Sequence, residues 1–313
     1  MERRKLKIGC IEIDNPFILA PMAGYSDCAF RRLCALSGAG LTLTEMVSVK
    51  GLLYSGQKSA ELLKTCNEEK VKCAQIFGAN PQDFYDVITK TDYLDGFDII
   101  DINMGCPVPK IVNNGEGSAL IKDIPRAQEI VSACVSGAKG KPITVKTRKG
   151  FKQGENKSVE FCLAMQKAGV SAITVHGRTR ADGYSGQNDF SIYSELKEEL
   201  SVPLLLSGDA DEHNANDLLN IADGVMIGRA SVGNPWIFAK ILGREVPLNI
   251  TETLLKHIDF MNEIYGEHYT VVNMRKFIGG YYGGIRGNKE IKQECYQTKT
   301  VAELIDVIKK INA

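Results

Sequence analysis

The stretch FDIIDINMGCP, residues 97–107, decides how this chain folds. Its first part, 97–102, is a short apolar run of the kind that forms a buried β-strand. The run ends in Asn-Met-Gly-Cys-Pro, where the glycine permits a turn and the proline stiffens the backbone that follows. We therefore expect a strand that presents Cys106 on a partly fixed loop, a place suited to chemistry rather than to packing.

Seven more apolar runs of this kind lie along the chain, and segments with helical periodicity, such as 124–134 and 158–168, separate them. The seven runs cover residues 17–20, 41–45, 73–77, 143–147, 172–176, 203–206 and 224–227. Apolar strands that alternate with helices indicate a parallel sheet covered on both faces. Eight such units predict a (β/α)8 TIM barrel. An open doubly wound sheet is the weaker alternative, because no Gly-x-Gly-x-x-Gly turn follows the first strand.

The pattern changes after residue 243. No further strands are expected, and residues 251–265, 271–282 and 301–311 have helical periodicity. The glycine pairs at 279–280 and 283–284 predict a break between helices. We expect a barrel over residues 1–243 and a small all-helical domain over residues 244–313.

Composition narrows the class of protein. The chain has 313 residues, of which 44% are hydrophobic and 24% charged, as in ordinary globular proteins. No apolar stretch is long enough to span a bilayer, and the opening MERRKLK lacks the apolar core of a signal peptide. Nine cysteines without a Cys-x-x-Cys pair indicate reduced thiols and no zinc site. We expect a cytoplasmic monomer that binds no membrane and no metal. Because the net charge is zero, a nucleic-acid partner would need a local basic patch.

Unusual polar, glycine or proline residues follow the predicted strands. In a TIM barrel these positions converge on the C-terminal face, where active sites lie. They are Pro21, Met22, Ala23, Gln75, Asn103, Cys106, Lys146, Arg148, His176, Arg178, Ser207, Gly208, Asp209, Gly228 and Arg229.

Three of these features suggest a ligand. Ser207-Gly208-Asp209 and Gly228-Arg229 lie where such barrels often bind phosphate through free backbone N–H groups, although ordinary glycine turns would look the same. Lys146 stands inside an apolar strand, so its ammonium needs an anion or an electron-rich ligand unless it reaches solvent. The amide of Gln75 suits a flat ring with alternating donors and acceptors, such as a flavin.

Basic residues indicate an anionic partner. Arg148, Arg178 and Arg180 are expected on an exposed rim of the barrel, with Lys110 beside the Cys106 loop. Residues 275–292 hold five basic side chains, including Arg275, Lys276 and Arg286, against one acidic side chain, which gives a local charge of +4. A solvated helix face would explain this cluster, and so would a surface that contacts nucleic-acid phosphates.

Taken together, the motifs resemble those of the tRNA-dihydrouridine synthase (Dus) family, and most closely its bacterial B-type branch. The matching motifs are APMAG (20–24), QIFG (75–78), NMGCP (103–107), VK (145–146), VHGRTR (175–180) and GR (228–229). The resemblance continues to the end of the chain, with two departures. Ser207 stands where the family often has asparagine, and Phe277 follows Arg275-Lys276 where the family often has histidine.

The resemblance implies an FMN-binding barrel and a helical domain that recognises RNA. In that family NADPH reduces the flavin, the reduced flavin delivers hydride to C6 of a uracil in tRNA, and a loop cysteine protonates C5. By this resemblance, Cys106 is expected to be the proton donor. The cofactor residues are Pro21, Met22, Ala23, Gln75, Lys146, His176, Ser207, Gly208, Asp209, Gly228 and Arg229. The substrate residues are Asn103, Lys110, Arg148, Arg178, Arg180, Arg275, Lys276 and Arg286.

Two other functions fit the same residues less well. One is an FMN-dependent barrel oxidoreductase that acts on a free small molecule, similar to dihydroorotate dehydrogenase. The basic C-terminal cluster favours RNA over such a substrate. The other is a flavoprotein that binds RNA without turnover, against which Cys106 and Lys146 argue.

Overall fold

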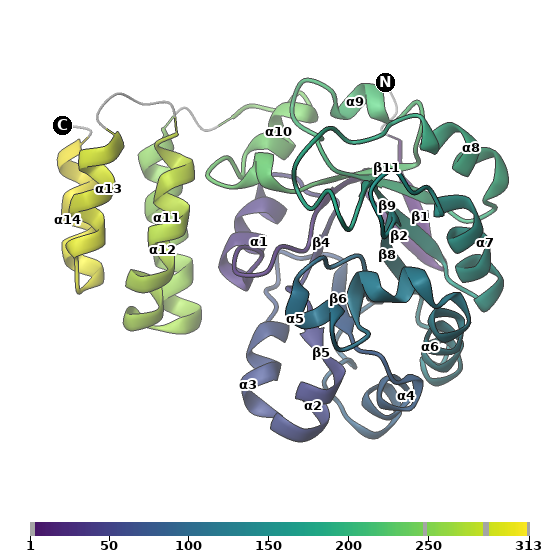
Figure 1. Cartoon of the computed structure of the whole chain (residues 1–313). Coiled ribbons are helices and arrows are strands. Elements are labelled where there is room, and N and C mark those ends of the chain that lie inside the picture. Colours follow the sequence, from purple (N-terminus) through teal and green to yellow (C-terminus); the bar gives the residue numbers. More distant parts are fainter. Residues whose placement is uncertain (1–3, 247–248, 284–287, 312–313) are drawn as a thin grey trace.

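The computed structural model describes residues 4–246, 249–283 and 288–311, which form a barrel with a helical domain beside it (Figure 1). Eight parallel strands make the barrel: β3 (Phe17–Leu19), β4 (Leu41–Leu43), β6 (Lys72–Phe77), β7 (Ile99–Met104), β8 (Ile143–Gly150), β9 (Ala172–Thr179), β10 (Leu204–Ser207) and β11 (Gly224–Ile227). Their order is β4-β3-β11-β10-β9-β8-β7-β6, and pairing of β4 with β6 closes the sheet. The predicted TIM barrel is confirmed. A two-residue strand, β5 (Val47–Ser48), extends the pairing of β6.

Helices surround the barrel. They are α1 (Cys28–Leu36), α2 (Val49–Ser55), α3 (Gln57–Ala60), α4 (Pro81–Lys90), α5 (Pro109–Val112), α6 (Ile124–Gly137), α7 (Ser158–Ala168), α8 (Ile192–Glu199), α9 (Ala215–Leu218) and α10 (Ile237–Ile241). Short 3-10 turns occupy Glu61–Leu63, Gly117–Lys122 and Arg229–Ser231. Helices α1, α4 and α6 begin at N-cap residues. The side chains of Asp27, Asn80 and Asp123 each accept a hydrogen bond from a backbone N–H group in the first turn.

Side-chain alternation divides the apolar residues into two cores. Ile100, Ile102 and Met104 of β7 point outward and pack under the helices, whereas Ile99 points into the barrel. The inner core also contains residues of a hairpin that the sequence did not predict, formed by β1 (Leu6–Ile8) and β2 (Ile11–Ile13). Its apolar side chains therefore pack against the inside of the barrel, at the end where the strands begin.

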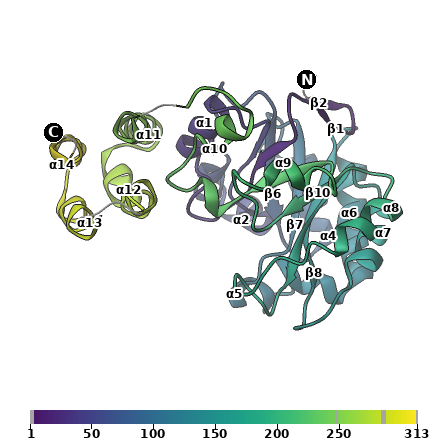
Figure 2. The same cartoon turned by 90° about the horizontal axis from the view of Figure 1, so that it is seen from above.

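The C-terminal domain consists of α11 (Ile250–Tyr265), α12 (Glu267–Tyr281), α13 (Asn288–Gln297) and α14 (Val301–Ile311). These helices lie side by side next to α1 and α10 of the barrel (Figures 1 and 2). The predicted C-terminal helices are present, although α12 begins earlier than expected and α13 was not predicted. Within the described part of the chain, none of the helices is both long and apolar enough to cross a membrane.

An aromatic cluster joins the two domains. Phe277 of α12 is fully buried, with its ring centroid 5.2 Å from that of Phe30 in α1 and 5.5 Å from that of Tyr25. His257 of α11 lies 4.5 Å from Phe277, and Tyr265 accepts a hydrogen bond from the backbone of Cys28. Phe277, one of the two departures from the family pattern, is therefore part of the junction core.

Close packing at this junction corrects one prediction. Gly279 and Gly280 do not break a helix, because both lie inside α12. A Cβ atom at Gly280 would lie 2.7 Å from the carbonyl oxygen of Val232, and one at Gly233 would collide with the backbone of Gly280. The glycines permit contact between α12 and the barrel backbone, which no larger residue allows.

We predict opposite effects for alanine at these two neighbouring glycines. Gly279→Ala should leave stability unchanged or raise it by up to about 1 kcal/mol, the usual gain in helix propensity. Its Cβ would meet only the flexible end of Lys292, at 3.3 Å. Gly280→Ala should lower stability by about 1–3 kcal/mol because it overpacks two backbones. Urea unfolding of both variants tests this, and equal shifts would contradict the account.

Candidate active site

A polar layer lies inside the barrel beyond the apolar inner core. Strands β6, β7 and β8 place Gln75, Asp101 and Thr144 side by side, since Asp101 is paired in register with both neighbours. Two residues further along, Asn103 is in register with Lys146. Residues two apart on a strand share a face, so these side chains line the C-terminal half of the barrel interior.

Backbone hydrogen bonds hold the Cys106 loop on two sides, to Asn103 of the polar layer and to Ser118 of the 3-10 turn Gly117–Lys122. Asn103 Oδ1 accepts hydrogen bonds from the backbone N–H groups of Gly105 (3.2 Å) and Cys106 (2.9 Å). The carbonyl of Cys106 accepts bonds from the backbone and hydroxyl of Ser118. The predicted fixed loop is therefore present. Asn103 Nδ2 donates to Gln75 Oε1, so the amide of Asn103 supports the loop.

The Cys106 side chain is largely buried, with 9% of the residue exposed. Burial raises the pKa of its thiol, and this effect outweighs the opposing influence of the Val108 backbone and the charges of Arg148 and Lys146. At neutral pH Cys106 therefore carries its proton. A protonated thiol is the form that can act as an acid.

Lys146 lies inside the barrel mouth without a protein partner. No hydrogen bond or ion pair joins its ammonium to any residue in the described ranges. Burial, assisted by the charge of Arg148, lowers the pKa of Lys146 to about 8. The ammonium is still mostly charged at neutral pH, so it is available to an anionic or electron-rich ligand.

His176 faces the same mouth from β9 and is neutral. Burial and the charges of Lys146, Arg148 and Arg178 lower its pKa well below the usual value. Arg178 Nη1 lies 3.3 Å from His176 Nε2. A guanidinium can only donate, so Nε2 is the acceptor and the ring proton is on Nδ1.

The two glycine turns at the ends of β10 and β11 offer free donors. The backbone N–H groups of Gly208, Asp209, Gly228 and Arg229 donate to no other residue in the part of the chain that the structure describes. Gly208 has φ +104°, and a Cβ there would lie 2.5 Å from His176 Cδ2, so glycine is required. The guanidinium of Arg229 lies beside these donors and makes only a 3.3 Å hydrogen bond to Asp209. Together the N–H groups and this guanidinium fit a phosphate group.

The carboxylate of Asp209 is already engaged. It accepts two bonds from Arg178, at 2.6 and 3.0 Å, and a weaker one from Arg229 at 3.3 Å. Asp209 can therefore serve a phosphate only through its backbone. Ser207, on β10, is buried, and Pro21, Met22 and Ala23 follow β3 with partly or fully exposed side chains.

The prediction of an exposed basic rim is wrong for two of its three arginines. Arg148 and Arg178 are each only 3% exposed. Arg148 donates to the carbonyls of Gly105, Thr179 and Gly183, and Arg178 donates to two carbonyls besides Asp209. Their guanidinium groups hold the loops of the mouth together. Arg180 is half-buried, and Lys110 is exposed on α5.

Tyr184, which was not predicted from the sequence, belongs to an irregular loop after β9. Its side chain is 63% exposed, and its ring lies 5.7 Å from the guanidinium of Arg148 and 5.5 Å from that of Arg229. An exposed ring held between two cations is a platform for a flat group. No periodicity marks such a residue, so the sequence alone offered no signal.

Two residues of the predicted basic cluster, Arg275 and Lys276, are half-buried. Lys276 is half-buried at the domain junction, 5.7 Å above the ring of Tyr25, and bonds to Asn273. Arg275 contacts the carbonyl of Thr298, at 3.5 Å. Arg286 lies outside the described residues.

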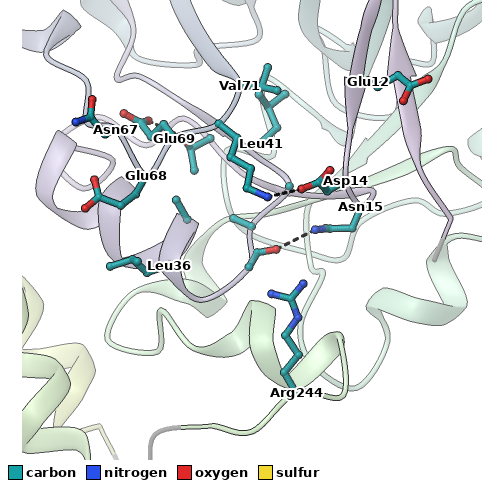
Figure 3. Close-up of a pocket in the computed structure, with 16 residues that line it drawn as sticks. Glu12, Asp14, Asn15, Leu36, Leu41, Asn67, Glu68, Glu69, Val71 and Arg244 are labelled. Atoms are coloured by element: carbon teal, nitrogen blue, oxygen red, sulfur yellow. Dashed lines mark hydrogen bonds and ion pairs between the residues drawn. The ribbon is translucent and has the colours of Figure 1, made fainter. Parts of the chain in front are cut away.

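A separate cavity of about 550 Å³ lies at the other end of the barrel (Figure 3). It is lined by residues that precede β3 and β4, including Asp14 and Asn15, and by Arg244. Asp14 pairs with Lys70, and Asn15 donates to the carbonyl of Gly38, as the dashed lines in Figure 3 show. None of the predicted site residues that the structure describes lines this cavity.

Fold and site together define a TIM-barrel enzyme whose mouth presents a protonated cysteine, an unpartnered lysine and a set of free N–H donors suited to phosphate. A family profile described as "Dihydrouridine synthase (Dus)" matches residues 18–312. The chain therefore belongs to the dihydrouridine synthase family.

Curated relatives agree over nearly the whole length. The chain is 36% identical to "tRNA-dihydrouridine synthase B" of Pseudomonas syringae pv. tomato over 299 residues, which cover 92% of this chain and 88% of the relative. It is 32% identical to the protein of the same name from Shewanella oneidensis over 315 residues, with 97% of each chain covered.

Solved structures support the fold. The old yellow enzyme from Trypanosoma cruzi has a TM-score of 0.57 at 11% identity, covering 79% of this chain and 93% of that one. Histamine dehydrogenase from Rhizobium sp. 4-9 has a TM-score of 0.59 at 13% identity, covering 83% of this chain and 51% of that one. At such identities the likeness concerns the fold alone.

The environment of Cys106 predicts its titration. The rate of its alkylation by iodoacetamide should rise with pH around a midpoint above about 8.5, the pKa of a free cysteine, because burial disfavours the thiolate. Lys146→Met should move the midpoint higher, since it removes a nearby positive charge. Peptide mass spectrometry measures this directly, because Cys106 is the only cysteine between Lys90 and Lys110. A midpoint below that of a free cysteine would contradict the description of the site.

Proposed function

We propose that this chain uses NADPH and bound FMN to reduce the C5–C6 double bond of a uridine in tRNA, giving dihydrouridine. The proposal rests on one observation above all. A member of the dihydrouridine synthase family presents a protonated cysteine on a loop at the barrel mouth, and Asn103 joins this loop to the polar layer that contains Lys146, a lysine without a partner among the described residues. The relatives named tRNA-dihydrouridine synthase B support tRNA as the substrate.

The residues of the mouth fit FMN. The free N–H groups at residues 208–209 and 228–229, with Arg229, would hold its phosphate, and Ser207 would lie beside the ribityl chain. Lys146 and Gln75 would contact the flavin ring, with Pro21, Met22 and Ala23 against it and His176 nearby. When bound, FMN supplies the hydride for C6 of the uracil. An ammonium at Lys146 favours the electron-rich, reduced form of such a ring by its charge.

Cys106 would complete the reduction by donating its thiol proton to C5 of the uracil, which balances the hydride added at C6. The thiolate left behind is reprotonated from solvent between turnovers. A uracil can reach this depth only when it leaves the RNA stack, which unpaired loop nucleotides do at low cost. Tyr184 provides an exposed ring at the entrance that suits a displaced base.

Lys110, Arg180 and the helical domain, residues 244–313, are proposed to hold the rest of the RNA. The candidate phosphate contacts of this domain are Arg275 of α12 and Lys289 and Lys292 of α13, of which Lys289 is exposed and the other two are partly buried. Arg148 and Arg178 act on RNA only indirectly in this proposal, by holding the mouth loops. The small-molecule alternative and the non-catalytic alternative are not favoured, because family membership covers both the barrel and the helical domain.

Removing the thiol should separate the two half-reactions. We predict that Cys106→Ala slows tRNA reduction by roughly 10²-fold or more, the usual cost of losing a general acid. The variant should still release about one FMN per chain on heating, and NADPH should still reduce its flavin at close to the wild-type rate. Rapid-mixing absorbance follows the flavin, and nucleoside analysis follows the RNA. Reduction of tRNA at the wild-type rate would show that Cys106 is not the acid.

A charge test addresses the helical domain. Neutralising Lys289 and Lys292 together should weaken tRNA binding, and each phosphate interaction removed should lower the slope of log affinity against log salt by about 0.7 to 0.9. Lys309→Gln with Lys310→Gln removes the same charge from the exposed end of α14 and is the matched control. NADPH oxidation without RNA should not change in either variant. Equal salt slopes in both double variants would remove the case for α13.

A further inference from the structure

A series of side-chain hydrogen bonds, called here the hydrogen-bond chain, connects a buried carboxylate to the Cys106 loop. Thr144 Oγ1 donates to Asp101 Oδ1 at 2.6 Å, and Gln75 Nε2 donates to Asp101 Oδ2 at 2.7 Å. Asn103 Nδ2 then donates to Gln75 Oε1 at 2.9 Å. Asn103 Oδ1 in turn accepts the N–H groups of Gly105 and Cys106. The hydrogen-bond chain therefore involves side chains of the three neighbouring strands β8, β7 and β6 before it reaches the cysteine.

Asp101 anchors one end of this hydrogen-bond chain, and it requires the same amide orientations that the loop N–H groups require at the other end. It is 1% exposed, and no cation contacts its carboxylate among the described residues. Burial raises the pKa of Asp101 to about 6, so it is ionised at neutral pH and can only accept hydrogen bonds. Gln75 must therefore turn its NH2 group toward Asp101 and its oxygen toward Asn103.

The orientation of the Gln75 amide determines that of the Asn103 amide. Because Gln75 offers an oxygen, Asn103 must turn its NH2 group toward Gln75, which leaves its own oxygen for the two N–H groups of the loop. If Gln75 were reversed, Asn103 would face those two N–H groups with its own NH2, donor against donor. Thr144 cannot set the direction, because a hydroxyl both donates and accepts.

We propose that Asp101 is a positioning residue whose carboxylate anchors the far end of the Gln75–Asn103 hydrogen-bond chain and so holds the Cys106 thiol where it can donate its proton. This inference rests on the proposed function in one respect, the role of Cys106 as the acid. The positioning itself is a property of the protein and is measurable without RNA.

The test measures protection of Cys106 from iodoacetamide in the purified flavoprotein, read from the peptide that ends at Lys110. Asp101→Asn keeps an acceptor for Gln75 but removes the negative charge of the anchor. Alkylation of Cys106 should become about tenfold faster, because the charge-assisted hydrogen bond from Gln75 becomes a weaker, neutral one and the Gln75–Asn103 chain is held less firmly. Cys134 and Cys162, which are fully buried, should stay protected and so report that the barrel remains folded.

Two further variants make the test specific. Thr144→Val removes a 2.6 Å hydrogen bond from the same carboxylate but leaves it an acceptor, so the Cys106 rate should stay within about twofold of wild type. Combining Asp101→Asn with Gln75→Glu restores one acceptor-only member to the chain, at position 75. This double variant should recover most of the protection of Cys106, and it decides the matter even if Asp101→Asn alone does not fold.

The expected activity change for Asp101→Asn is a fall in kcat for tRNA of about tenfold with little change in KM, because the acid is displaced while the groups that bind tRNA stay in place. Unchanged protection and kcat in Asp101→Asn, or no rescue in the double variant, would overturn the inference while leaving the proposed function intact. Exposure of Cys106 in Asp101→Asn, with no dihydrouridine formed by the wild type, would support the positioning role and reject the proposed function.

Discussion

The closed parallel barrel imposes one constraint on which the rest of the structure depends: every second residue of each strand must point into an interior that water does not fill. The first inward layers are apolar and are covered by the side chains of the N-terminal hairpin. The layers beyond them are polar, and every polar group there needs a partner. Asp101, Gln75 and Asn103 are hydrogen-bonded to one another, whereas Lys146 has no hydrogen-bond or ion-pair partner among the residues that the structure describes. The candidate active site is therefore the part of the barrel interior where polar groups have no partner among the described protein residues.

The same constraint explains the buried arginines. Arg148 and Arg178 occupy inward positions near the ends of β8 and β9, so they lie under the mouth loops instead of on an outer rim. Each guanidinium has several donors in a rigid plane, which suits the binding of several backbone carbonyls at once. These arginines keep the mouth positively charged while fixing its shape. Their charges also help to keep His176 neutral.

Much of this could be predicted from the sequence, because strand periodicity and strand-end polarity follow from local physics. The eight barrel strands, three of the four C-terminal helices and the convergence of Gln75, Asn103, Cys106 and Lys146 were all expected, although α12 begins earlier than predicted. Other features depend on contacts between distant segments. The hairpin β1–β2 has strands of only three residues, and the glycines of α12 are explained only by the barrel backbone they touch. Likewise, no local pattern distinguishes an arginine at a rim from one bound to carbonyls.

The central claim is that this chain reduces uridine in tRNA, and direct formation of the product tests it best. Purified protein, NADPH and tRNA transcribed without modifications would be incubated together, and the digested nucleosides would be separated by mass. The account predicts a nucleoside heavier than uridine by two hydrogen atoms, formed in excess over the protein and absent without NADPH. NADPH consumption with no such nucleoside, on any tRNA from the same cell, would contradict it.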